Sequence, residues 1–256
     1  MSSATLSTQE PAPEQLSEPA RIFNTFTAPS KTFTDLQRNS NWSVPFLLIA
    51  IVSLIFIYTI DRQVGFEQIS KNEIAKSASR SEQLDKLPPD QKAKQMRVAT
   101  TFTRVFSYVS PVFVLVAFLV TAAVLMGTFN LGMGASIPFM RAMAIVVYGS
   151  LPSILAALLG IVSLVAAGMS GSLDKEAFNI NNAVATNPAY FMDPTSNKFL
   201  YGMASALDVF IIWNIVLMGI GFACNSKVKR GTAIGAVAGW YLVWKVGTAA
   251  IALAFS

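Results

Sequence analysis

The chain has 256 residues, of which 53% are hydrophobic and only 13% are charged, with a formal net charge of +5. Soluble domains carry about 25% charged residues, so this composition predicts an integral membrane protein. The chain has no His and a single Cys, Cys224. These counts exclude histidine acid–base catalysis, zinc sites built from Cys and His, disulfide frameworks and Cys-ligated iron–sulfur clusters, and we expect neither a metal nor a cofactor.

The N-terminal part of the chain divides into two segments. Residues 1–20 contain three Glu and several Pro but almost no large apolar side chains, which predicts a disordered tail. In residues 21–43, aromatic and aliphatic side chains alternate with polar ones around Pro29. This amphipathic pattern has two interpretations. The segment lies in the lipid headgroup region, or it forms a short helix that packs against a membrane bundle.

Five long apolar segments predict transmembrane helices. A hydrocarbon core of about 30 Å needs roughly 20 apolar residues in a helix, and continuous apolar runs favour helices over the alternating strands of a barrel. The predicted spans cover residues 44–60, 105–128, 139–168, 204–224 and 232–255. The predicted fold class is therefore all-α, a polytopic membrane protein with a bundle of five transmembrane helices in residues 44–255.

Residues 61–104 form a predicted extramembrane loop between the first two spans. Acids and bases are interleaved in this loop, which favours a solvated helical hairpin over a basic patch for nucleic acid or anionic lipid. Two prolines in residues 87–90 predict a break, after which a helix runs into the second span. We therefore expect no nucleic acid partner.

The distribution of Lys and Arg leaves the orientation in the membrane open. The side with the N-terminal segment and the second and fourth loops carries seven of these cations, and the opposite side carries eleven, which favours a cytoplasmic C-terminus. Locally the signal is reversed. The fourth loop, residues 225–231, holds three cations and no acid, whereas the third loop is longer and nearly neutral.

Polar side chains within the predicted spans are candidate functional groups. Lys245 lies near the middle of the fifth span, where a lysine costs roughly 2.5–3.5 kcal/mol and needs a partner or water. Asp208, in the fourth span, is its predicted partner. The pair either fixes helix register or forms a proton- or ion-coupled site; alternatively, Lys245 extends to the membrane surface. Asn214 is expected to bond across to another helix.

Prolines and glycines predict local features of the spans. Pro111 and Pro152 each predict a helix kink, with a broken helix that lines a site as the alternative. A stripe of small residues runs along the fifth span at Gly231, Gly235, Gly239 and Gly247. Such a stripe allows close approach of another helix, either within the monomer, where Gly219 and Gly221 offer an opposing surface, or at a homodimer seam.

Enzyme motifs are absent from the sequence. It contains no GxxxxGK[ST], HExxH or GxSxG sequence and no paired aspartates within a span. Without His, a serine nucleophile would need a lysine base, and the pattern pairs no specific serine with Lys245. We therefore expect a protein that is not an enzyme and has no catalytic residues.

Several short motifs occur in a recognisable order across residues 21–250. They are Pro29-Ser30-Lys31-Thr32-Phe33, Trp42-Ser43-Val44-Pro45-Phe46-Leu47, Leu87-Pro88-Pro89-Asp90-Gln91, Arg104-Val105-Phe106-Ser107-Tyr108, Tyr148-Gly149-Ser150-Leu151-Pro152, Ser205-Ala206-Leu207-Asp208-Val209-Phe210-Ile211-Ile212-Trp213 and Trp240. In their order and spacing the chain resembles the Yip domain family, whose eukaryotic members are membrane proteins that interact with Ypt/Rab GTPases, and it looks most like the bacterial branch.

The resemblance implies a five-helix bundle in the inner membrane of a bacterium, with the N-terminus in the cytoplasm and the C-terminus on the far side. It implies a non-enzymatic scaffold or adaptor that binds proteins or lipids. Eukaryotic relatives bind prenylated small GTPases in vesicle trafficking, partners that a bacterial cell lacks. The alternative is a small transporter or channel that uses Asp208, Asn214 and Lys245. The expected partners are the lipid bilayer and an unidentified protein, with a homo-oligomer as a further option.

Overall fold

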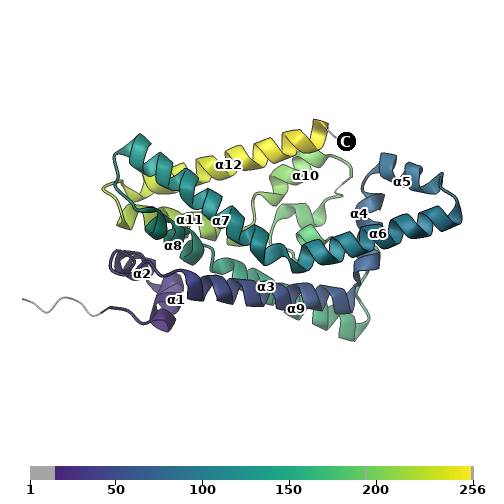
Figure 1. The fold of residues 1–256 in the computed structure, drawn as a ribbon, viewed down its shortest axis with the longest axis horizontal. Coiled ribbons are helices and arrows are strands. Elements are labelled where there is room, and N and C mark those ends of the chain that lie inside the picture. Colours follow the sequence, from purple (N-terminus) through teal and green to yellow (C-terminus); the bar gives the residue numbers. More distant parts are fainter. Residues whose placement is uncertain (1–14, 194, 255–256) are drawn as a thin grey trace, which may run out of the picture.

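A computed structural model describes residues 15–193 and 195–254 (Figure 1). Every regular element in these residues is a helix, which confirms the all-α class. The α-helices are α1 (Glu18–Thr27), α2 (Pro29–Asp35), α3 (Ser43–Gln63), α4 (Phe66–Ala75), α5 (Ala78–Asp85), α6 (Pro89–Tyr108), α7 (Ser110–Gly127), α8 (Phe139–Gly149), α9 (Pro152–Ser170), α10 (Lys198–Ser205), α11 (Val209–Cys224) and α12 (Arg230–Ala254). Three short segments add to them: η1 (Thr128–Gly132), a π-helical turn, and the 3₁₀ turns η2 (Ile180–Asn182) and η3 (Pro188–Phe191).

The helices that could cross a membrane match the first three predicted spans. Ser43–Gln63, Ser110–Gly132 and Phe139–Ser170 are long and apolar enough. The fourth predicted span is a bent pair, because Phe199–Ser205 and Val209–Cys224 meet at 58°, and counting the pair as one span gives up to four. α12 is about 37 Å long at 1.5 Å per residue. It is nevertheless not among the helices in the described residues that are both long enough and apolar enough to cross a membrane.

The long helices lie along one common axis, so their ends gather at two opposite ends of the bundle (Figure 1). α3 and α9 pack side by side and run parallel, with Gly160 of α9 against Phe56 and Gly168 against Gln63. α7 packs on α8 and α11 on α12, and in both pairs the helices run antiparallel. The start of α3, the starts of α8 and α12 and the end of α11 lie near α1 and α2, at the left of Figure 1. We call this the N-terminal end. The opposite end, which carries α4, α5 and most of α6, is called the loop-one end.

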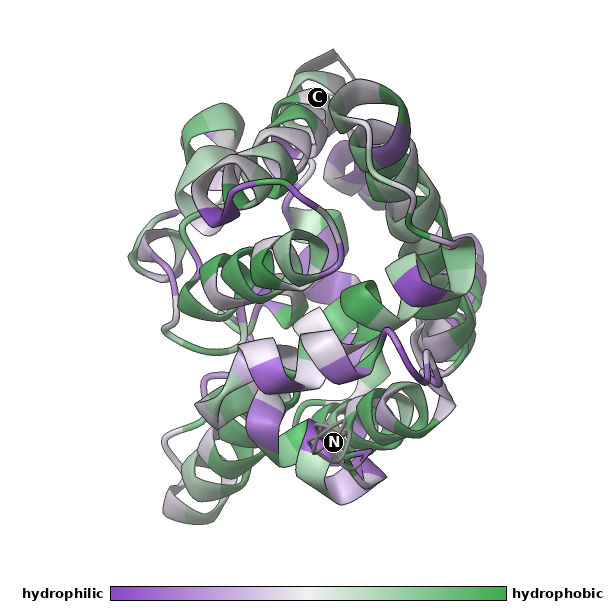
Figure 2. Cartoon of the chain, turned by 90° about the vertical axis from the view of Figure 1, so that its left-hand side faces the viewer, coloured by the Kyte–Doolittle hydropathy of each residue, from purple (hydrophilic) through white to green (hydrophobic). Residues whose placement is uncertain are grey.

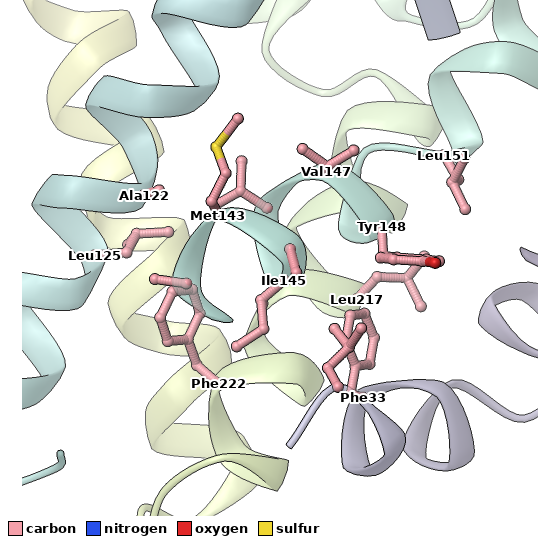
Figure 3. Close-up of a cluster of buried hydrophobic side chains, with 14 of the residues drawn as sticks. Phe33, Ala122, Leu125, Met143, Ile145, Val147, Tyr148, Leu151, Leu217 and Phe222 are labelled. Carbon is pink, nitrogen blue, oxygen red and sulfur yellow. The ribbon is translucent and has the colours of Figure 1, made fainter. Parts of the chain in front are cut away.

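The core surrounds α8, in which residues 142–149 are all buried (Figure 3). Phe33 from α2 and Leu217 and Phe222 from α11 pack around it. The rings of Phe129 and Phe222 stack with their centres 4.5 Å apart. A helix that is apolar on every side is stable only when neighbours cover every side. α8 therefore ties the N-terminal helices to the apolar helices of the bundle.

The two prolines that predicted kinks both lie in the first turn of a helix. α6 ends at Tyr108 and α7 begins at Ser110, which places Pro111 in the first turn of α7. The third predicted span is interrupted by a turn at residues 150–151, and Pro152 is the first residue of α9. Proline has no backbone N–H to donate, so it is accommodated where the helix has no acceptor for that group. The expected kinks are thus junctions between consecutive helices.

Residues 61–104 are largely helical, as expected for this loop. α4 and α5 follow α3, and α6 packs back against α4. The predicted break coincides with the start of α6, since Pro88 precedes the helix and Pro89 is its first residue. No residue of α6 is buried, whereas Phe66 and Ile69 of α4 are. The loop is therefore a partly packed hairpin whose α6 side faces outward.

α1 begins at Glu18, within the segment predicted as a disordered tail over residues 1–20. The hydroxyl of Ser17 accepts a hydrogen bond from the backbone N–H of Ala20, and Pro19 occupies the first turn. Both residues favour the start of a helix. The tail prediction for residues 1–14 falls outside the described residues.

Candidate functional site

A buried ion network holds α1 and α2 on the bundle. The side chain of Arg21 is fully buried, and its Nε donates to Oδ2 of Asp35 over 2.7 Å. Its Nη1 lies 3.1 Å from Oε1 of Glu18. The hydroxyl of Tyr148, on α8, donates to Oε2 of Glu18 over 2.6 Å. One guanidinium therefore links α1 to α2, and through Glu18 both are linked to the most buried helix of the protein.

The surroundings of Arg21 keep its guanidinium charged. Burial alone lowers the pKa of Arg21, but the hydrogen bond and the charge of Asp35, followed by the charge of Glu18, raise it above the ordinary value. The hydroxyls of Thr25 and Thr32 both donate to the backbone carbonyl of Arg21 at 2.8 Å. The network is thus an ion triad in which Nε and Nη1 of the buried guanidinium have acidic partners, while Nη2 has no hydrogen-bond partner among the described residues.

These contacts bear on the two interpretations of residues 21–43. Phe33 and Leu36 are fully buried, and α2 packs against α11, so this part of the segment forms short helices on the bundle. Phe23 on α1 remains 66% exposed. In the sequence, Arg21 is one of the seven Lys and Arg residues on the side of the N-terminal segment, and nothing more was predicted of it. Its spacing of three residues from Glu18 was the available local signal for an ion pair.

Asp208 starts α11 and is not embedded within a continuous fourth span. Its Oδ1 accepts the backbone N–H groups of Phe210 and Ile211 at 2.9 and 3.2 Å. Its Oδ2 accepts a short hydrogen bond from the hydroxyl of Thr186 and lies 3.4 Å from Nδ2 of Asn187. An aspartate that precedes an apolar helix is a strong N-cap. This capping function explains why the fourth predicted span breaks here.

Lys245 lies on α12 beside α10. Its Nζ is 3.4 Å from Oγ of Ser205 and 5.8 Å from the centre of the Tyr241 ring. Within the described residues, no salt bridge joins Lys245 to Asp208. The carboxylate is instead engaged by the helix N-terminus and by Thr186. Coupling between the two charges therefore stays a prediction.

Asn214 forms the interhelix contact that was expected of it. Its side-chain amide and Oγ of Ser153, on α9, are 2.9 Å apart. With the amide turned over, its nitrogen donates to the carbonyls of Phe210 and Gly149 at 3.2 Å and its oxygen accepts from Ser153. Either orientation joins α11 to the start of α9.

The glycine stripe on α12 is not the surface that packs against α11. A Cβ at any of its four positions would meet no atom within 4 Å, and these positions are Gly231, Gly235, Gly239 and Gly247. A Cβ on Gly219 of α11 would instead lie 2.6 Å from the backbone Cα of Ile234. The close approach of the two helices thus depends on Gly219 of α11. Ala233 and Val237 are buried, so the face of α12 that points inward is not the face that carries the glycine stripe.

A cavity of about 740 Å³ lies at the loop-one end, between α4, α9 and the segment that follows α9. Its polar walls bond to one another. Nζ of Lys76 donates to Oδ1 of Asn179 over 2.9 Å, and Nδ2 of Asn179 donates to the hydroxyl of Tyr201 over 2.8 Å. In the described residues, no group of three His, Cys, Asp or Glu side chains is placed to hold a metal ion. The sequence reasoning overlooked this cavity, although the Asn-rich stretch 179–187 was a signal.

Comparison with known proteins defines the family. A search of curated proteins found no match, and a search of solved structures found none. The family model described as Yip1 domain matches residues 23–251. The match begins within α1, after Glu18 and Arg21, and ends within α12, so it includes α2, the buried α8 and the capped α11. The chain belongs to the Yip1 domain family of membrane proteins.

Proposed function

We propose that this protein is a non-enzymatic membrane scaffold or adaptor that binds proteins or lipids through its N-terminal end. The observation that carries the proposal is the buried network around Arg21, which fixes α1 and α2 to α8 and α11. A surface that is held in a constant orientation relative to the bundle is suited to binding a partner, because little order has to be imposed when the partner binds. Buried contacts to a membrane helix achieve this, whereas a flexible tether does not.

The proposed topology has five spans in a bacterial inner membrane, with the N-terminal end in the cytoplasm. α12 has 25 residues, about 37 Å, enough to cross a hydrocarbon core of about 30 Å. With five crossings, the C-terminus lies on the far side. The local excess of cations in residues 225–230 supports the placement of the N-terminal end in the cytoplasm.

Cys224 tests this topology directly, because it is the single cysteine of the chain and lies at the N-terminal end. A membrane-impermeant maleimide should label Cys224 in inverted vesicles and not in intact cells. A Cys224→Ser, Phe191→Cys variant serves as the matched control, since Phe191 is 81% exposed and lies in the segment between α9 and α10. It should show the opposite pattern. Labelling of Cys224 from outside would overturn the topology.

The transport alternative receives little support from the polar side chains on which it was based. Asp208 is engaged as a helix cap, Asn214 bonds to Ser153, and Lys245 contacts Ser205. Each of these groups already has a partner within the chain. Such contacts explain their presence structurally, without a permeating ion.

The adaptor proposal is tested by photocrosslinking from the exposed face of α1. Benzoylphenylalanine replaces Phe23, which is 66% exposed, and in a control chain it replaces Phe191, which is 81% exposed at the loop-one side. After extraction into lipid nanodiscs, mass spectrometry identifies crosslinked and co-purified molecules. We expect a stoichiometric protein or a defined lipid crosslinked from position 23 and not from position 191. A chain that crosslinks nothing from position 23 and conducts an ion or solute in vesicles would overturn the proposal and support the transporter.

A further inference from the structure

Five cationic side chains lie close to α2 at the N-terminal end. They come from α2, from the first turn of α8, and from the link between α11 and α12 with the first residue of α12. We call them the basic rim, and they are Lys31, Arg141, Lys227, Lys229 and Arg230. All are exposed except Arg141, which is partly buried. Figure 2 views the bundle from this end, where hydrophilic segments lie among apolar helices.

Hydrogen bonds between distant parts of the chain hold the rim together. Nη2 of Arg230 donates to the hydroxyl of Ser30 over 3.0 Å, which joins the start of α12 to α2. Nη2 of Arg141 donates to the carbonyl of Gln37 over 3.2 Å, and Nε2 of Gln37 donates to the carbonyl of Cys224 over 2.7 Å. These bonds bring α2, the start of α8 and the start of α12 into one assembled surface, although 200 residues separate Ser30 from Arg230.

The acids among the described residues near the rim are bound to another side chain. Among residues 15–43, 128–149 and 219–236, the acids are Glu18 and Asp35. Both are bound to the buried Arg21. In addition, Nε of Arg141 is buried without a hydrogen-bond acceptor. The rim thus presents a net positive charge and unused donors toward the surroundings.

The rim lies where apolar helices end. Arg141 is in the first turn of the Phe139–Ser170 helix, and Lys227 to Arg230 directly follow α11. Leu131, in η1 at the same end, is 91% exposed, so an apolar surface adjoins the charged one. Lys and Arg at the ends of membrane helices extend their charges to the level of the headgroups.

We infer that the basic rim binds the phosphate groups of anionic phospholipids in the leaflet on the N-terminal side. The position of the rim at the ends of apolar helices favours a lipid over an acidic protein, because a lipid places its phosphate beside the charged helix ends and its acyl chains beside the apolar helices. The inference rests on the proposed function and names the lipid class that the N-terminal end would bind. It also gives α1 and α2 a second attachment, to the membrane itself.

Lipid competition measured by native mass spectrometry tests the inference. The full chain, in micelles that contain phosphatidylglycerol and phosphatidylcholine in equal amounts, should carry mostly phosphatidylglycerol. The variant K31Q/K227Q/K229Q should lose this preference by roughly 10- to 100-fold, because each cation near an anionic surface contributes separately to binding. None of these three side chains forms a hydrogen bond or ion pair among the described residues, so the fold should persist, as circular dichroism would verify.

The matched control is R80Q/K86Q/K94Q, which removes three exposed cations at the loop-one end and should keep the preference. An equal preference in all three chains would overturn the inference. Displacement of the lipid by millimolar inorganic phosphate, or tighter binding of polyglutamate, would overturn it in favour of a soluble anion or an acidic protein. Photocrosslinking from Phe23 in nanodiscs of phosphatidylcholine alone measures protein partners independently, so failure of lipid binding is distinguishable from failure of the adaptor proposal.

Discussion

The two ends of the bundle use ion pairs in different ways. At the N-terminal end, the side chains of Arg21 and Asp35 are 1% and 6% exposed and connect two helices. At the loop-one end, those of Lys71 and Glu67 are 49% and 66% exposed, one turn apart on the same helix. Arg21 and Asp35 are 14 residues apart in the sequence, whereas Glu67 and Lys71 are four apart. Because the Arg21–Asp35 pair is buried, it fixes the position of two helices, whereas the exposed Glu67–Lys71 pair is solvated and contributes little to stability.

Removal of the buried cation should have the largest effect. Arg21→Met leaves the carboxylate of Asp35 buried without its partner, which costs about 3–5 kcal/mol of unfolding free energy. Reversible unfolding in mixed micelles, followed by circular dichroism, measures the loss. A loss no greater than that of Lys71→Met would contradict the difference between the two ends.

Overpacking the contact between α11 and α12 should come second. In Gly219→Leu the new side chain meets the backbone of Ile234, whose Cα lies 2.6 Å from the Cβ position. We expect a loss of about 1–3 kcal/mol. Gly239→Leu is the matched control, because no atom lies within 4 Å of its Cβ position. Equal melting temperatures for the two variants would show that α11 and α12 do not pack in this way.

Removal of the Asp208 cap measures how much the start of α11 contributes to the stability of the fold. Asp208→Ala removes the acceptor for the N–H groups of Phe210 and Ile211 and should cost about 1 kcal/mol. Asp208→Asn, which retains an acceptor, should lose less. A stability unchanged by Asp208→Ala would remove the explanation for the break between α10 and α11.

A single hydroxyl connects the ion network to α8. Tyr148→Phe deletes the hydrogen bond to Glu18 while leaving the ring in the core, and a loss of about 1 kcal/mol is expected. The double variant with Glu18→Gln should lose less than the sum of the single variants, because the two groups share one interaction. Strict additivity would show that the hydroxyl and the carboxylate act independently.

The smallest effect is expected at the exposed pair. The hydrogen bond and the charge of Lys71 lower the pKa of Glu67. A lowered folded-state pKa stabilises the fold above the unfolded-state pKa, and this contribution is lost as the pH falls through the folded-state value. Lys71→Met should therefore shift the titration of Glu67 upward in carbon-13 NMR. It should lower the melting temperature at neutral pH only slightly, because the pair is exposed to solvent, and a decrease as large as that of Asp208→Ala would contradict the assignment of this pair to a solvated surface.

The sequence predicted the elements better than it predicted their junctions. Apolar runs marked the first three spans because helix formation in lipid depends on local composition. The break at Asp208 was overlooked because the same apolar run continues on both sides of it, and only the cap shows where α11 begins. The glycine stripe on α12 could be recognised in the sequence, but the sequence does not show whether α11 packs against the stripe or against another face of α12.

Sequence alone determined that this is a helical membrane protein of the Yip1 domain family, because hydrophobic runs and the order of motifs are properties of the chain itself. Tertiary structure alone decided which charges are buried. Glu18 and Tyr148 are 130 residues apart, and Ser30 and Arg230 are 200 apart. Contacts over such separations arise from the packing of α1 and α2 on α8 and α11, and no local pattern encodes them.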